Sequence, residues 1–111
     1  MDPLNTLDIP QGIKADIGFA VQTLIDKFPW NIAKIILFGS YATGRYQPDS
    51  DIDILVALNQ LPDLKERHQY TQALDTDRDI DLLFCSAAQL AGNDRVYKRA
   101  QAHGVVLYEQ L

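Results

Sequence analysis

Four aspartates stand in two pairs of equal spacing, and these residue types could hold a metal ion. Asp51 and Asp53 begin the apolar segment DIDILVAL, and Asp79 and Asp81 begin the apolar segment DIDLLFC. Residues two apart in a strand point to the same face, so each pair presents its carboxylates together. If the two strands are neighbours, three or four carboxylates converge. Carboxylate oxygens are ligands that Mg²⁺ prefers, so the pattern predicts a divalent-cation site.

The alternative interpretation is that these aspartates are solvated residues of loops and strand edges. Unpaired buried carboxylates are costly, and a divalent cation would relieve their repulsion. We therefore favour the metal role for Asp51, Asp53 and Asp81. Asp79 replaces Asp81 as the ligand if the strand register slips by two residues. For the nearby Asp75 and Asp77, we favour solvated residues.

Gly39 and Ser40 follow the short apolar run KIILF and could bind phosphate. Glycine lets the backbone approach a phosphate closely, and the following N–H groups and the serine hydroxyl can bind its oxygens. A Gly-Ser pair alone is weak evidence, since most such pairs are turns. Here, however, ten residues separate Ser40 from Asp51 at the start of the next strand. Carboxylates, metal ions and a phosphate-binding turn are the parts that phosphoryl or nucleotidyl transfer requires.

The elements that must position these residues follow from hydrophobic periodicity. Apolar residues at three- and four-residue steps predict a helix from Gln11 to Phe28, which Pro29 ends. Residues 1–10 are predicted to form an arm and residues 41–50 a loop. We expect strands over 34–38, 51–58 and 79–85, and helices over 62–74, 86–90 and 94–103. This order predicts one α/β (α+β) domain over residues 1–111, with a short mixed sheet and helices mainly on one face.

Composition and charge exclude several classes of protein. The net charge of −5 disfavours a protein that binds nucleic acid by bulk electrostatics. No apolar run approaches the ~20 residues that a membrane span needs. The first ten residues lack the basic and apolar regions of a secretory signal, and Cys85 is the one cysteine. We therefore expect a cytoplasmic protein with no membrane partner.

Residues 37–56, LFGSYATGRYQPDSDIDILV, resemble the signature of the polymerase-β-type nucleotidyltransferase superfamily, which is Gly-Ser, ten residues, Asp-x-Asp. The short chain is similar to the minimal nucleotidyltransferase (MNT) group of that superfamily. The resemblance extends to Asp81 in DIDLLF and to the ending HGVVLYE. It implies the nucleotidyltransferase fold.

The resemblance also implies roles for the residues of the signature. Gly39 and Ser40 would hold the nucleotide phosphates. Many minimal members have a basic residue at the position of Thr43, and Arg45 is the candidate to replace it. Ser50 either contacts a phosphate or caps the turn before the strand.

In the same family, the carboxylates hold the metal. Asp51 and Asp53 would bind two Mg²⁺ ions, with Mn²⁺ as the alternative. Asp81 would be a third ligand or the base for the acceptor hydroxyl. The expected reaction transfers NMP, in the first place AMP from ATP, to that hydroxyl.

Minimal members often accompany a small HEPN-domain protein, and the resemblance suggests a toxin–antitoxin pair. This chain would then be the antitoxin, and the acceptor would be a tyrosine of the HEPN toxin. The sequence shows no helical acceptor-binding region like that of larger members, which also favours a partner protein as acceptor. The alternative is an antitoxin that neutralises its partner by binding alone. A homodimer is left open.

One cluster of basic residues lies outside the signature. Arg95, Lys98 and Arg99 recur at three- and four-residue steps on the last predicted helix, and His103 ends it. Such a cluster is typical of a solvated helix face. The alternative is that it holds a triphosphate or an acidic partner. His103 has no cysteine or histidine at zinc-ligand spacing.

Overall fold

The computed structural model describes residues 3–74 and 79–110, and these form a four-stranded mixed sheet. The strand order is β3-β2-β1-β4. β1 runs antiparallel to β2 and β4, whereas β2 and β3 are parallel. The strands are β1 (Ile32–Phe38), β2 (Ile52–Leu58), β3 (Ile80–Ser86) and β4 (Val105–Glu109).

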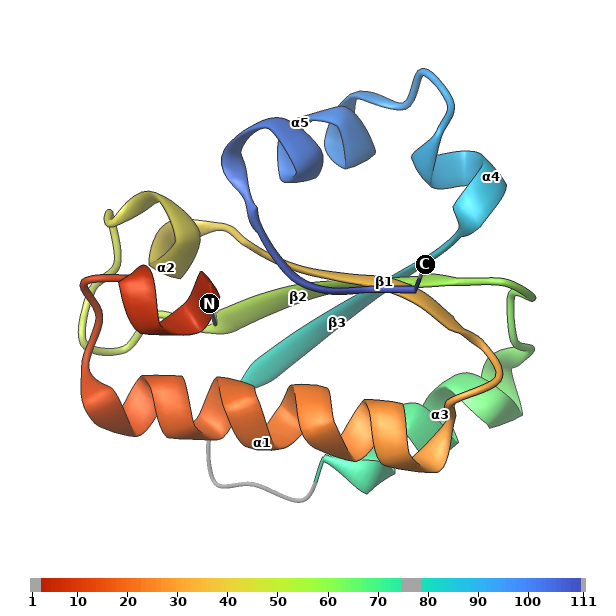
Figure 1. Ribbon diagram of the computed structural model, residues 1–111, viewed down its shortest axis with the longest axis horizontal. Helices are drawn as coiled ribbons and strands as arrows, with labels where there is room; N and C mark the ends of the chain where they lie inside the picture. The colour runs from red at the N-terminus through yellow and green to blue at the C-terminus, as the bar shows by residue number, and fades with distance from the viewer. Residues whose placement is uncertain (1–2, 75–78, 111) are drawn as a thin grey trace.

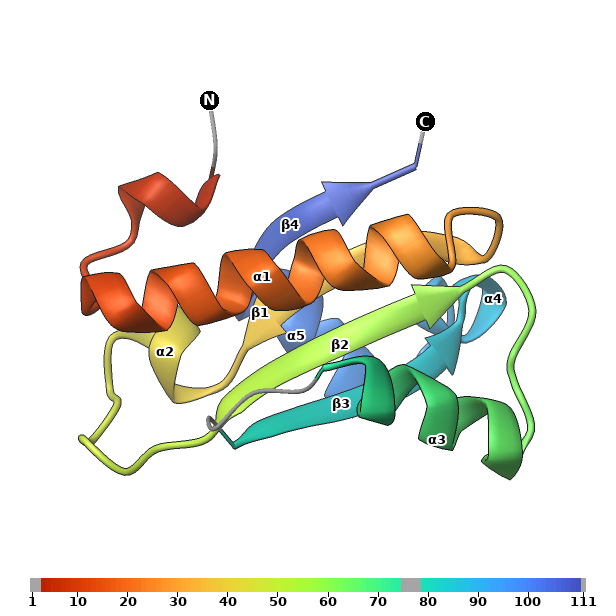
Figure 2. The ribbon, with the colours of Figure 1, turned by 90° about the horizontal axis from the view of Figure 1, so that it is seen from below.

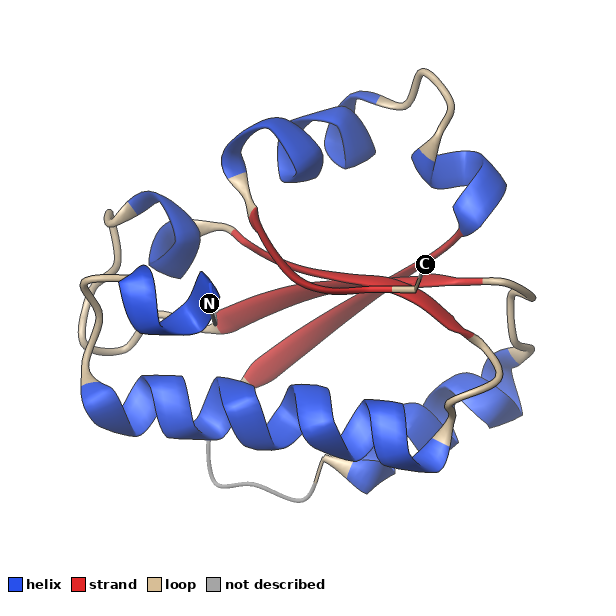
Figure 3. Cartoon of the chain, viewed as in Figure 1, coloured by secondary structure: helices blue, strands red, loops and turns tan. Residues whose placement is uncertain are grey.

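Helices cover both faces of this sheet (Figures 1 and 3). α1 (Gln11–Lys27) and α3 (Leu64–Ala73) lie on one face, and α4 (Ala87–Leu90) and α5 (Arg95–His103) lie on the other. The short α2 (Ser40–Thr43) follows β1. The fold class is the predicted one. The helices were predicted to lie mainly on one face. α1 and α3 share one face, whereas α4 and α5 form a further layer on the opposite face.

The long helix α1 buries the apolar stripe that its sequence predicted. Ile13, Ile17, Ala20 and Leu24 are buried, and Val21 packs against the same core from a partly buried position. Figure 2 shows α1 crossing the sheet beside α3. α1 ends at Lys27, because Pro29 cannot continue the helical hydrogen bonding.

Alternation along β2 divides its side chains between the two faces. Ile52 and Ile54 pack with α1 in the larger core. Leu55 packs with Leu90 and Ala100 on the α4–α5 side. Since residues two apart share a face, Asp53 belongs to the face that carries Leu55. Asp53, near the start of β2, is therefore on the face of the sheet that α5 covers.

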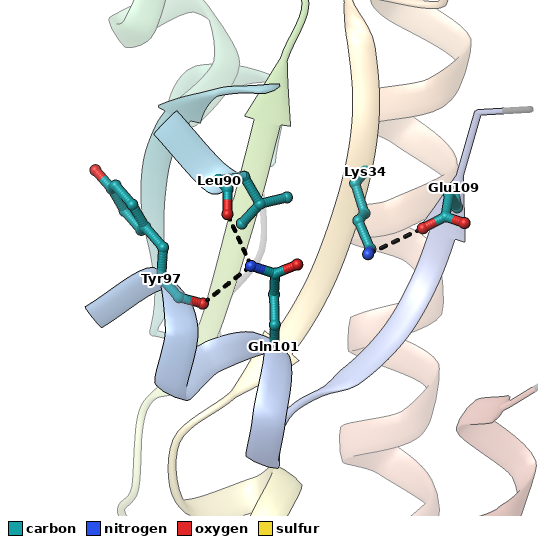
Figure 4. A network of polar contacts seen from close by, with 5 residues as sticks. All are labelled: Lys34, Leu90, Tyr97, Gln101 and Glu109. Atoms are coloured by element: carbon teal, nitrogen blue, oxygen red, sulfur yellow. Dashed lines mark hydrogen bonds and ion pairs between the residues drawn. The ribbon is translucent and has the colours of Figure 1, made fainter. Parts of the chain in front are cut away.

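Polar contacts hold α5 and β4 in place (Figure 4). Gln101 Nε2 donates to the carbonyl of Leu90 at 2.9 Å, which joins α5 to the end of α4. Lys34 Nζ lies 2.9 Å from Glu109 Oε2, which joins β1 to β4. Between these contacts, Gly104 ends α5 by donating its N–H to Ala100 at 2.8 Å. The C-terminal half of α5 is thus joined to α4 through Gln101, and β4, which follows α5, is joined to β1.

The remaining segments extend the sheet or cap the core. The segment VVLYE forms the edge strand β4 beside β1. Within the predicted arm, residues Pro3–Thr6 form a 3-10 turn, and Leu4 and Ile9 are buried. Asp75 and Asp77 lie outside the described residues. In the described ranges, no helix has the length and apolar character needed to cross a membrane.

Candidate active site

Asp53 and Asp81 lie side by side on parallel strands. They are Cα partners in the β2–β3 pairing, in a continuous register that runs from Ile52 with Ile80 to Leu58 with Ser86. The Ile52 N–H donates to the Asp79 carbonyl at 3.0 Å, directly before this pair. Asp51 precedes β2 by one residue and is exposed. The condition on which the convergence of the carboxylates depended, that the two acidic strands are neighbours, is therefore met.

The carboxylates act on one another electrostatically. Partial desolvation raises the pKa of Asp53, and the negative charges of Asp81 and Asp51 raise it further. Desolvation also raises the pKa of Asp51, with contributions from the charges of Asp81 and Asp79 and from a side-chain hydrogen bond with Asp81. Every interaction that shifts these two groups disfavours the ionised form. A cation placed among them would reverse that effect.

The register distinguishes Asp81 from Asp79, which the sequence left open. Asp81 is the register partner of Asp53 and raises the pKa of both Asp53 and Asp51. Asp79 raises the pKa of Asp51 but is not among the groups that raise the pKa of Asp53. It precedes β3, and its carbonyl accepts the Ile52 N–H. The geometry thus places Asp81, and not Asp79, beside Asp53.

Gly39 lies against the Asp53 carboxylate at the end of β1. Phe38, the residue before it, pairs with Asp53 across the β1–β2 ladder. The backbone at Gly39 has φ 77° and ψ −154°, a conformation that is essentially restricted to glycine. A Cβ at this position would overlap Asp53 Oδ2 and would lie 3.1 Å from Cγ. Glycine is therefore required both by the turn and by the space beside the carboxylate.

The other residues of the signature form the turns around this point. Ser40 begins α2, and its carbonyl accepts the Arg45 N–H at 3.0 Å. Arg45 is exposed and follows Gly44, whose left-handed conformation ends α2. The Ser50 hydroxyl accepts the Gln47 N–H at 2.7 Å, so its side chain caps the turn before β2. Thr43 and Arg45 line the same pocket as Gly39.

An open pocket of about 750 Å³ begins at Gly39 and extends toward α5. This volume lies within the range of small-molecule sites. Two predicted nucleotide-binding residues, Gly39 and Arg45, line it. On the α5 side the pocket is lined by Arg99, for which the sequence favoured a solvated helix face over a triphosphate contact, and by His103, four residues further along the same helical face. The full lining is Phe38, Gly39, Thr43, Arg45, Val96, Arg99, Ala100, His103 and Gly104.

The carboxylates fit a metal that completes its coordination from the substrate. In the part of the chain that the structure describes, no three His, Cys, Asp or Glu side chains converge closely enough to hold a metal by themselves. Mg²⁺ commonly binds through one or two carboxylates, with phosphate oxygens and water as its other ligands. The Asp53–Asp81 pair, with Asp51 beside it, supplies oxygen donors of that type.

Comparison with known sequences identifies a domain family. A model described as a nucleotidyltransferase domain matches residues 20–107 of this chain. A Methanocaldococcus jannaschii protein that carries the name "Putative protein adenylyltransferase" is 33% identical over 66 residues, which make up 60% of each chain. The chain therefore spans 60% of the length of this curated relative.

Comparison with solved structures points in the same direction. A chain in a crystal structure of a toxin–antitoxin with AMP-PNP superposes with a TM-score of 0.65 at 29% identity, over 84% of this chain and 73% of that one. A chain in the complex of tri-AMPylated Shewanella oneidensis HEPN toxin with MNT antitoxin superposes with a TM-score of 0.60 at 26% identity. That match covers 87% of this chain and 72% of the other.

Proposed function

Because the chain belongs to the nucleotidyltransferase domain family, we propose that it transfers a nucleoside monophosphate from a nucleoside triphosphate to an acceptor hydroxyl. Membership confirms the resemblance seen in residues 37–56. The observation that carries the proposal is the placement of Asp53 beside Asp81, with Gly39 against the Asp53 carboxylate. A phosphate-binding turn and a carboxylate pair side by side at one edge of the sheet are what this reaction needs.

In the proposed step, the acceptor oxygen forms a bond to the α-phosphorus, and the bond from the α-phosphorus to the bridging oxygen breaks. Pyrophosphate leaves with that electron pair. Bound Mg²⁺ would supply positive charge against the phosphate oxygens and lower the pKa of the hydroxyl. Asp51 and Asp53 would hold the metal, and Asp81 would be a third ligand or would accept the hydroxyl proton. Gly39 and Ser40 would position the phosphates through backbone N–H groups and the serine hydroxyl.

ATP is the proposed donor, and a HEPN-domain protein is the proposed acceptor. The similar structures support this: one contains AMP-PNP, and another contains an AMPylated HEPN toxin with its MNT antitoxin. The name of the curated relative also describes transfer to a protein. In this proposal the acceptor hydroxyl is a tyrosine of the toxin, and modification silences the toxin.

The direct test is to incubate the purified chain with Mg²⁺, ATP labelled at the α-phosphorus, and the HEPN-domain protein from the same organism. We expect label on the partner, and we expect Asp53→Asn to abolish it. Asp63→Asn is the matched control, because Asp63 caps α3 through the Glu66 N–H and Asn caps helices equally well. Labelling by Asp53→Asn at the rate of the Asp63 control would overturn the proposal.

A non-catalytic antitoxin is the alternative function. Such a protein would neutralise its partner by covering it, so Asp53→Asn would neutralise as well as the unmodified chain. The charge of Asp81 disfavours ionisation of both Asp51 and Asp53, in addition to their desolvation, and this favours the enzyme, because a surface that only binds gains nothing from carboxylates that repel one another. A neutralisation assay with Asp53→Asn, run beside the labelling assay, separates the two functions.

A further inference from the structure

The pocket beside Gly39 has a basic wall, and its α5 side lies outside the nucleotidyltransferase signature of residues 37–56. Arg99 and His103 face it from α5, and Arg45 faces it from the segment after α2. Phe38 and Ala100 add apolar surface. The wall therefore combines cationic groups from two segments that lie far apart in the sequence.

The basic groups of this wall are free to bind an anion. In the described ranges, neither Arg45 nor Arg99 forms an ion pair with a carboxylate, although the chain carries a net charge of −5. α5 holds Arg95, Lys98 and Arg99 and has no acidic residue within its bounds. A row of unpaired cations in an acidic protein indicates a place where negative charge arrives from outside.

The position of the wall specifies which anion. Gly39 lies against the Asp53 carboxylate and also lines the pocket, so the pocket borders the proposed metal site at Gly39. A triphosphate bound with its α-phosphate at the metal site carries further negative charge on its β- and γ-phosphates. The pocket is where cationic side chains could compensate that charge.

We propose that Arg99 and His103 of α5, together with Arg45, hold the β- and γ-phosphates of the nucleoside triphosphate, and thus the leaving pyrophosphate. This inference rests on the proposed function and adds the residues that select a triphosphate over a monophosphate. Arg99 provides a planar, permanently charged fork that suits phosphate oxygens. His103 adds a ring N–H donor one helical turn further along the same face.

The other cations of α5 provide an internal comparison. Arg95 and Lys98 do not line the pocket at Gly39; they line a smaller depression of about 370 Å³ that adjoins it through Val96 and Arg99. Arg95 is exposed, like Arg99. If the basic helix acted only through its total charge, loss of Arg95 and loss of Arg99 would have equal effects.

The test measures binding of ATP and of AMP by isothermal titration calorimetry, in Mg²⁺, with the full chain. The variants are Arg99→Gln, His103→Gln and the control Arg95→Gln, with circular dichroism to verify that each is folded. We expect Arg99→Gln to weaken ATP binding by about tenfold or more and His103→Gln to weaken it less. AMP binding should remain unchanged in both, and Arg95→Gln should bind both nucleotides like the unmodified chain.

The outcomes separate this inference from the proposed function. Equal ATP affinity in Arg99→Gln and Arg95→Gln would overturn the inference, even if the unmodified chain labels its partner. Absence of ATP binding by the unmodified chain would also overturn it. Selective loss of ATP binding in Arg99→Gln would support the inference even if no transfer were detected, in which case the proposed function alone would fail.

Discussion

Asp53 on β2 and Asp81 on β3 are register partners on parallel strands, and partial desolvation together with the charge of Asp81 raises the pKa of Asp53. Two like charges held this closely oppose folding unless a cation or a proton neutralises them. The site is thus assembled against its own electrostatics. The structure keeps it in place through the continuous β2–β3 pairing and the apolar residues on both faces of β2.

Asp53→Asn should therefore stabilise the metal-free protein at neutral pH while abolishing transfer. The pKa of Asp53 lies above its ordinary value of 3.8 in the folded state. The folded state consequently binds more protons than the unfolded state between the two pKa values, and stability falls as the pH rises through that window. The gain from Asp53→Asn should be complete above the raised pKa and should vanish below 3.8. Urea unfolding of both proteins across this pH range measures it.

The Asp63→Asn control should show no such gain, since Asp63 caps α3 through the Glu66 N–H, a role that asparagine fills equally well. A fall in the stability of Asp53→Asn at neutral pH, with an unchanged far-ultraviolet spectrum, would contradict the electrostatic explanation.

Mg²⁺ should stabilise the unmodified protein and should have little effect on Asp53→Asn. A ligand that binds only the folded state adds about 2.7 kcal/mol at one hundred times its dissociation constant. Thermal unfolding in a titration of MgCl₂ measures the effect. NaCl at matched ionic strength is the control, because screening alone also weakens repulsion among exposed charges. Equal stabilisation by the two salts would argue against a specific metal site.

Gly39→Ala and Gly44→Ala should have different consequences, although both glycines have positive φ. At Gly39 the substitution should cost about 1–3 kcal/mol in backbone strain and should also displace the Asp53 carboxylate, so transfer should be lost. At Gly44, apart from its own chain neighbours, no atom of residues 3–74 or 79–110 lies within 4 Å of an added Cβ. That substitution should cost about 1–2 kcal/mol and leave transfer measurable. Chemical unfolding and the labelling assay are the two readouts.

Gly44→Asn refines this comparison, since asparagine tolerates the left-handed conformation that Gly44 adopts at φ 81° and ψ 8°. Its stability should exceed that of Gly44→Ala. Equal activity in the Ala variants at positions 39 and 44 would show that the space beside Asp53 is not required.

Asn31→Ala should lower stability without affecting the site. Asn31 is buried, and its side chain donates to the Gln60 carbonyl at 2.9 Å and to the Tyr70 hydroxyl at 3.1 Å, and accepts the Gln60 N–H at 2.8 Å. Removal leaves these groups unpaired and should cost about 1–3 kcal/mol. Asn31 lies before the start of β1, whereas Gly39 follows its end. Transfer measured well below the melting temperature should therefore be unchanged.

Asn59→Ala is the matched control at the same end of the sheet. Asn59 is exposed, and its side chain bonds the Trp30 carbonyl and the Gln110 side chain. Its loss should cost only about 0.5 kcal/mol. Urea unfolding of both variants tests whether burial, rather than the number of hydrogen bonds, determines the cost.

Much of the fold could be predicted because its elements have strong local patterns. The apolar stripe of α1 and the strand at β2 follow from spacing alone, and their bounds differ from the prediction by one residue at one end. The strand character of VVLYE was not assigned, because a short apolar segment at the end of a chain has no periodicity to classify it. Its pairing with β1 comes from contacts with residues that are distant in sequence.

The candidate site divides in the same way. The sequence by itself determined the carboxylates, the Gly-Ser turn and their spacing, since these are properties of consecutive residues. Only the tertiary structure decided that Asp81 and not Asp79 stands beside Asp53, because strand register is fixed by pairing across the sheet. It also decided that Arg99 and His103 share a pocket with Gly39 and Arg45. A helix in isolation presents all its faces to solvent, and packing of Ala100 and Leu90 against the sheet selects the face that turns toward the site.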